Sequence, residues 1–179
     1  MMYEFPNQGL PVGPTIATLS IECLGAEVGS SVQNYASAAY PAANRAYYIP
    51  FHLDEPILVT KLFCANGATV SGNVDMGIYD SNFTRIVSIG STVQAGTSAL
   101  QAFDITDTLI GPGDFYLAIA LDNATGTIYN GANPTLPVVQ AAGILMQASA
   151  FPLPANATPV TSSATTVPLV GLRTKGTAL

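Results

Sequence analysis

The chain has 179 residues, of which 9% are charged and 49% are hydrophobic, and its formal net charge at pH 7 is −6. An ordinary soluble domain contains about 25% charged residues, so this chain has too little charge to cover a monomer's surface in the usual way. We therefore expect much of its surface to be buried against copies of itself or other proteins. No basic residue lies between Arg85 and Arg173, which argues against the clustered basic face that direct nucleic-acid binding requires.

The sequence pattern predicts neither a secretory signal nor a membrane anchor. The first residues, MMYEFPNQGLPVGP, contain no basic segment followed by an apolar one. The most apolar stretch, Leu136–Phe151, is interrupted by Pro137, Gln140 and Gln147, so it is too short to span a bilayer. We expect synthesis in a cytoplasm, without export by a recognisable signal and without membrane contact.

Residues 1–44 are predicted to form an extended N-terminal arm. Prolines and glycines keep the first stretch irregular, and residues 25–43 are mostly small. Between them, Thr15–Cys23 alternates in the manner of one short strand. One face of that strand would carry Thr15, Ala17, Leu19, Ile21 and Cys23, and the other would carry Ile16, Thr18, Ser20 and Glu22.

Residues 45–179 are predicted to form a β-sandwich domain organised around residues 111–123. In GPGDFYLAIALDN, Phe115, Leu117, Ile119 and Leu121 alternate with a second apolar set that includes Tyr116. A strand that is apolar on both faces is typical of the middle of a sandwich, where each face is covered.

The other predicted strands are separated by turn signals. Pro50 removes a ladder donor, so the strand that contains it should lie at an edge or carry a bulge. In residues 73–80, Asp75 and Tyr79 are predicted to point outward, opposite an inward apolar set. The predicted strands are 45–53, 57–65, 73–80, 85–91, 98–106, 136–148 and 165–173, with 149–166 as a loop rich in Pro, Ala and Thr. The last of them would close the sandwich beside the first. The fold class is therefore all-β, an antiparallel β-sandwich of jelly-roll type.

Five blocks carry a resemblance to a known group of proteins. They are RAYYIPFHL (45–53), GNVDMGIYD (72–80), GPGDFYLAIALDN (111–123), AFPLPA (150–155) and VPLVGL (167–172). Together they resemble β-sandwich structural proteins of tailed bacteriophage virions, which occur as head-decoration and as tail or fibre components. The resemblance spans about residues 45–173 and implies a virion protein with a jelly-roll-like domain. It does not choose between head and tail.

No residue is predicted to be catalytic, to bind a cofactor or to hold a metal. His52 is the single histidine and has no partner motif, so we interpret it as a surface or interface residue. Cys23 and Cys64 are interpreted as buried small residues rather than a disulfide. Six aspartates fall mostly at strand ends, where turn formation is the commoner role and calcium binding is the open alternative. They are Asp75, Asp80, Asp104, Asp107, Asp114 and Asp122.

Five tyrosines suit a sandwich core, a protein interface or a glycan-stacking surface. They are amphipathic with one polar end, which fits a core and an interface; the interface is favoured, and the glycan-stacking surface is the alternative. These residues are Tyr47, Tyr48, Tyr79, Tyr116 and Tyr129.

The sequence thus predicts a non-enzymatic phage virion protein that decorates or cements the capsid surface. Its partners would be the major capsid (coat) protein and itself, as a homotrimer, with the arm lying on the coat protein or on a neighbouring subunit. The alternative is a receptor- or glycan-binding module of a tail fibre or baseplate. That module would use tyrosines and loop aspartates at one end of the sandwich.

Overall fold

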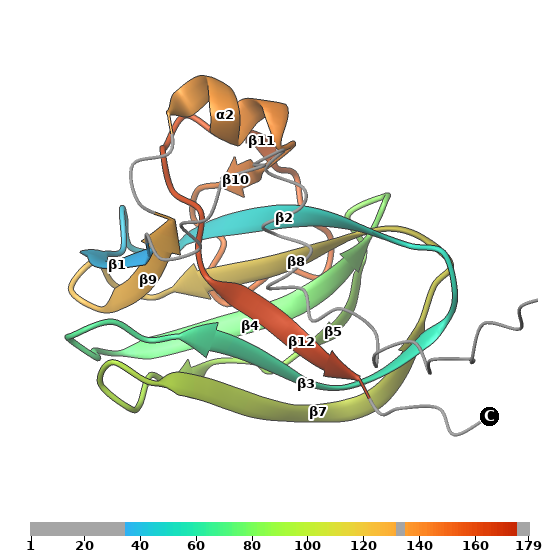
Figure 1. Ribbon diagram of the computed structural model, residues 1–179, viewed down its shortest axis with the longest axis horizontal. Coiled ribbons are helices and arrows are strands. Elements are labelled where there is room, and N and C mark those ends of the chain that lie inside the picture. The colour runs from blue at the N-terminus through green and yellow to red at the C-terminus, as the bar shows by residue number, and fades with distance from the viewer. Residues whose placement is uncertain (1–34, 132–134, 175–179) are drawn as a thin grey trace, which may run out of the picture.

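The computed structural model describes residues 35–131 and 135–174, which form twelve strands and one helix. Every strand pairing is antiparallel, so the predicted all-β antiparallel fold is confirmed (Figure 1). The jelly-roll connectivity stays a prediction.

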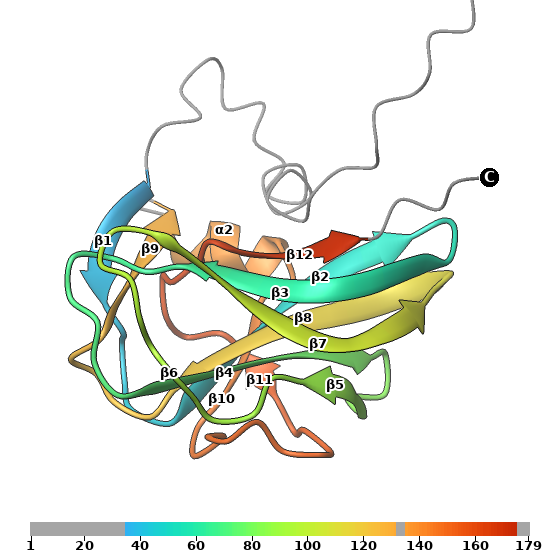
Figure 2. The same cartoon turned by 90° about the horizontal axis from the view of Figure 1, so that it is seen from below.

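Two sheets form the sandwich, and a small third sheet flanks them (Figure 2). The large sheet has the order β11 (Val160–Thr161), β10 (Leu145–Gln147), β2 (Arg45–Leu53), β8 (Gly113–Leu121), β4 (Asn73–Asp80) and β5 (Arg85–Ser88), and β6 (Thr92–Val93) also pairs with β4. The smaller sheet has the order β12 (Val170–Thr174), β3 (Ile57–Ala65) and β7 (Leu100–Ile110). The flanking sheet pairs β1 (Tyr35–Ala39) with β9 (Thr127–Gly131).

The main hydrophobic core lies between the two sheets, and β8 is its central strand. As predicted, β8 lies between β2 and β4, and its residues 117–121 are buried on both faces. Phe115, Leu117, Ile119 and Leu121 point into the main core. Ala118 and Ala120 point the other way and are also fully buried.

A second, smaller core lies on the outer face of the large sheet. Residues 149–157, which we call the strap, cover one end of this face; Leu153 of the strap is buried there with Tyr48 and Tyr79. The predicted outward direction of Asp75 and Tyr79 holds, because both point away from the main core. Both are nevertheless fully buried, since the strap covers them.

The predicted strand at residues 136–148 is wrong in its first half. This part forms the short helix α2 (Leu136–Ala141), with a proline in its first turn, and only Leu145–Gln147 form a strand. A proline in the first helical turn has the fixed φ that a helix needs and loses no hydrogen bond there. Gly143, with φ of 71°, allows the chain to turn from the helix into β10.

The predicted boundary between arm and sandwich at residue 44 is placed too late. Tyr35–Ala39 pair with β9, and Tyr40 is 1% exposed in the main core. The Tyr40 hydroxyl donates to the backbone oxygens of Arg45 and Ile119, at 2.8 and 3.0 Å. The folded domain therefore includes residues 35–44. The predicted strand Thr15–Cys23 and the rest of residues 1–34 lie outside the described residues.

Two further predictions concern strand edges. β10 pairs only with Ala46–Tyr48 of β2, so at Pro50 the strand has β8 on one side and is locally an edge, as predicted. The last strand begins at Val170 rather than Thr165 and pairs with β3. The prediction that it closes the sandwich beside the first strand, 45–53, is wrong, because β2 lies in the large sheet and β12 pairs with β3 in the smaller one.

Candidate functional site

The strap leaves the other end of the large sheet's outer face open, and side chains of several kinds gather there. The strand register places Pro50 opposite Tyr116 and His52 opposite Asp114, all on the outer face. We call this group the outer-face patch; it consists of Pro50, His52, Asp54, Phe83, Asp114 and Tyr116.

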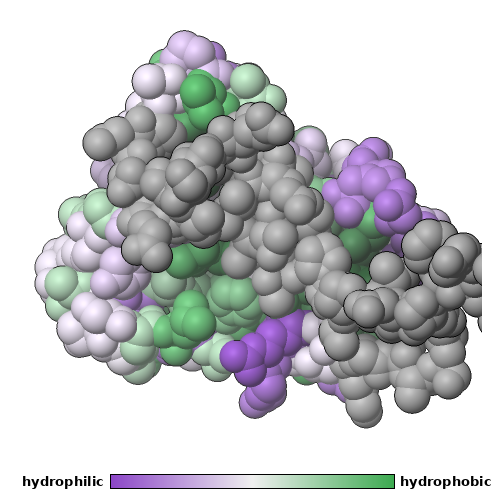
Figure 3. Space-filling model, viewed as in Figure 1, coloured by the Kyte–Doolittle hydropathy of each residue, from purple (hydrophilic) through white to green (hydrophobic). Residues whose placement is uncertain are grey.

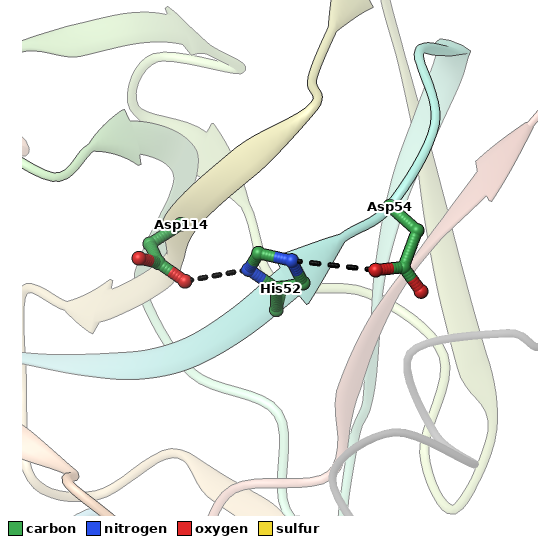
Figure 4. Close-up of polar contacts among 3 residues, drawn as sticks. All are labelled: His52, Asp54 and Asp114. Carbon is green, nitrogen blue, oxygen red and sulfur yellow. Dashed lines mark hydrogen bonds and ion pairs between the residues drawn. The ribbon is translucent and has the colours of Figure 1, made fainter.

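His52 lies between two aspartates at the exposed end of the patch (Figure 4). Its Nδ1 is 2.7 Å from Asp114 Oδ1, and its Nε2 is 3.5 Å from Asp54 Oδ1. The hydrogen bond with Asp114 favours the protonated imidazole, so it raises the pKa of His52 above its ordinary value. The His52 side chain is 59% exposed, which confirms the prediction of a surface residue.

Neither partner of His52 was predicted from the sequence. His52 and Asp114 are 62 positions apart, and only the register between β2 and β8 brings them together. Asp54 follows β2 directly, so its proximity was open to prediction, but the direction of its side chain was not.

The arrangement around His52 differs from known catalytic constellations. Both imidazole nitrogens face carboxylates, whereas a nucleophile–base–carboxylate set needs a hydroxyl or thiol on one of them. Within residues 35–131 and 135–174, no group of three or more His, Cys, Asp or Glu side chains is placed to hold a metal ion. The trio can offer charge-assisted hydrogen bonds to a ligand at the surface.

The second component of the patch is a half-buried aromatic pair. The rings of Phe83 and Tyr116 lie 4.7 Å apart, centroid to centroid, with an interplanar angle of 34°. Phe83 also packs edge-on against Tyr48, at 6.3 Å. The pair therefore stands on the second core and exposes part of its surface beside Asp114.

The fold divides the five tyrosines between the cores and the surface. Tyr47, Tyr48 and Tyr79 are fully buried, so for these three the core role is confirmed and the favoured interface role and its glycan-stacking alternative are wrong. Burial raises the pKa of Tyr48 to about 12. Only Tyr116 and Tyr129 remain partly exposed. Tyr47 lies in the main core with the other inward residues of its strand, whereas Tyr48 and Tyr79 are covered by the strap, which alternation alone did not reveal.

Most of the predicted aspartates have structural roles. Asp80 Oδ1 accepts hydrogen bonds from the backbone of Asn82 and Thr84, and Asp122 Oδ1 accepts one from the backbone of Asn73, which confirms the turn interpretation for both aspartates. Asp104 forms an ion pair with Lys61 on the neighbouring strand.

The burial of Asp75 was not predicted from the sequence. It is fully buried, and its carboxylate accepts hydrogen bonds from the Leu153 backbone at 2.9 Å and from the Ser88 hydroxyl at 3.0 Å. Burial raises the pKa of this carboxyl above its ordinary value. Cys64 is also buried, as predicted, and burial raises the pKa of its thiol to about 12.

Several large hydrophobic side chains are exposed on the described surface. Leu109 is 67% exposed, Val93 65% and Leu100 61%, and Val160 on β11 is also exposed. Figure 3 shows hydrophobic residues among the described atoms of one face, beside a strongly hydrophilic group. No helix in the described parts of the chain is long and apolar enough to cross a membrane.

Comparisons with family models, with curated proteins and with solved structures gave no match for this chain. The resemblance to phage virion proteins therefore stays a prediction.

Proposed function

We propose that this chain is a non-enzymatic structural protein of a phage virion, which decorates or cements the capsid by binding coat-protein subunits. The observation that carries the proposal is the composition: 9% charged residues and 49% hydrophobic residues. A surface so poor in charge is better suited to being covered by other proteins than to free diffusion.

The described surface supports this proposal in two ways. Leu100 and Leu109 on β7 expose apolar area along an edge strand of the smaller sheet. The backbone of such an edge can pair with a strand of another protein. A homotrimer on the capsid surface would repeat these contacts, so that weak individual contacts add up to firm attachment.

Co-sedimentation with purified coat-protein shells of the virus that encodes the chain tests the proposal. We expect saturable binding. The exposed-edge double variant Leu100→Asp, Leu109→Asp should bind with an affinity lower by a factor of at least about ten. Thr97→Asp, which adds a charge at another exposed position, is the matched control. Absence of binding by the unmodified protein, together with a monomeric state in analytical ultracentrifugation, would contradict the proposal.

A glycan- or receptor-binding module of a tail fibre or baseplate is the second candidate, and the outer-face patch favours it. An aromatic ring pair next to carboxylates offers a stacking surface for the apolar face of a sugar and acceptors for its hydroxyls. A glycan array probed with the intact protein tests this candidate. Sugar-specific binding that Tyr116→Ala abolishes and Tyr129→Ala preserves would favour it over capsid decoration.

A further inference from the structure

The smaller sheet has fewer strands than the large sheet that it covers. β7 lies against β5, β3 against β4, and β12 against β8. In Figure 1, β12 crosses in front of β4 and β8. The next position in this series, beside β12, faces β2. Among the described residues, no strand of the smaller sheet takes that position.

The inner face of β2 is suited to being covered by a strand. Tyr47, Ile49 and Phe51 point from β2 toward the main core. The Tyr47 hydroxyl is buried and has no hydrogen-bond partner among the described residues. Since buried polar groups in folded proteins are almost always paired, the described residues do not complete the surroundings of this hydroxyl.

The free edge of β12 provides the backbone groups for such a strand. Within the described part of the chain, β12 pairs with β3 alone, so its other side presents backbone donors and acceptors. Arg173 on this strand is exposed, and no described carboxylate forms an ion pair with it. An added strand that carries an acidic residue would complement this charge.

The start of β1 lies close to the start of β12. Tyr35 pairs with Gly131, whose backbone N–H donates to Val167 at 2.9 Å, three positions before β12 begins. Neighbouring strands are about 5 Å apart, so these two steps cover about 10 Å. Residues 24–34 can span up to roughly 36 Å when extended. The segment that precedes them can therefore reach the edge of β12 in the same molecule.

We propose that the segment Thr15–Cys23 binds along the free edge of β12 as an additional strand of the smaller sheet, opposite β2. Its alternation fits this position on both faces. Ala17, Leu19 and Ile21 would face the inner side of β2, and Glu22 on the other face would complement Arg173. This assignment does not rest on capsid decoration, and it leaves residues 1–14 for other contacts.

Hydrogen–deuterium exchange of the full-length chain tests the proposal. In the unmodified protein, we expect amides on both sides of β12 to be protected. In the double variant Leu19→Asp, Ile21→Asp, the amides on the free edge of β12 should exchange at least about tenfold faster, because the apolar face of the segment Thr15–Cys23 no longer packs against β2. The matched control Thr18→Asp, Ser20→Asp changes the outward face and should preserve protection. Equal exchange of β12 in all three proteins would overturn the assignment.

Two further measurements identify the occupant. Charge reversal at Glu22→Arg or at Arg173→Glu should weaken the protection of β12, and combining the two should restore it. In analytical ultracentrifugation, protection that persists in the monomer supports the chain's own segment. Protection that appears only in an oligomer would overturn the intramolecular assignment in favour of a second copy. Protection that appears only with coat-protein shells would overturn it in favour of a coat-protein strand.

Discussion

The two ends of the large sheet's outer face make an instructive comparison. Both ends carry an aspartate that accepts hydrogen bonds and a tyrosine that packs against aromatic rings. At the covered end, Asp75 and Tyr79 are fully buried beneath the strap. At the open end, the Asp114 side chain is 75% exposed, and Tyr116 is only half-buried.

The comparison shows that covering, not residue type, sets the energetics of this face. Asp75 and Asp114 are chemically identical, yet desolvation raises the pKa of Asp75, whereas solvent screens the contact between Asp114 and His52. The covered end therefore contributes to stability, and the open end is available for recognition. Substitutions at the two ends should therefore differ in their cost to stability.

Tyr79→Ala should have the largest effect, because it empties a fully buried aromatic site under the strap. We expect the free energy of unfolding to fall by about 3–5 kcal/mol, measured by urea denaturation. Tyr79→Phe keeps the ring and loses only the hydrogen bond to the Pro154 carbonyl, so it should cost about 1 kcal/mol. Tyr116→Ala at the open end should cost less than Tyr79→Ala. A larger loss at Tyr116 would reverse the comparison.

Asp75→Ala should have the next largest effect. It leaves the Leu153 N–H and the Ser88 hydroxyl without their buried acceptor, which should cost about 1–3 kcal/mol of unfolding free energy. Asp75→Asn keeps an acceptor for Leu153 and removes the buried charge, so it should cost less than Asp75→Ala. The two variants, compared by thermal and urea unfolding, separate loss of the hydrogen bonds from loss of the charge.

The stability difference between the unmodified protein and Asp75→Asn should depend on pH. Because the folded-state pKa of Asp75 is raised, the folded protein binds this proton more tightly than the unfolded chain does. The stability of the unmodified protein relative to Asp75→Asn should therefore fall as the pH rises from the ordinary aspartate pKa to the folded-state pKa. Above that window the difference should be constant. A relative stability that rises with pH across this window would show that the hydrogen bonds outweigh burial.

Asp114→Asn at the open end should have the smallest effect on stability. The exposed contact with His52 should shift the imidazole titration without a measurable change in melting temperature. We expect the pKa of His52, followed by NMR, to move down toward its ordinary value in this variant. Asp54→Asn, whose oxygen lies farther from the imidazole, should move it less. An unchanged His52 titration in Asp114→Asn would mean that the hydrogen bond does not form in solution.

Much of the strand framework could be predicted from the sequence. Alternation and turn residues placed three strands correctly at 45–53, 57–65 and 73–80, together with the central strand β8. The predicted loop 149–166 is correct except for β11, which forms within it. These features are local: apolar alternation with period two, and turn residues at the ends, specify a strand without reference to distant residues. The low charge is likewise a property of the chain alone.

Which surfaces are buried and which residues meet depends on how the whole chain packs. The strap buries Asp75 and Tyr79 through backbone contacts with residues almost 80 positions away, and register brings Asp114 to His52. Neither could be predicted, because alternation fixes the face on which a side chain lies but not what covers that face. Residues 136–141 form a helix where a strand was predicted, for a similar reason. A short apolar run with one proline is compatible with a helix or a strand, and packing against the rest of the chain determines which one forms.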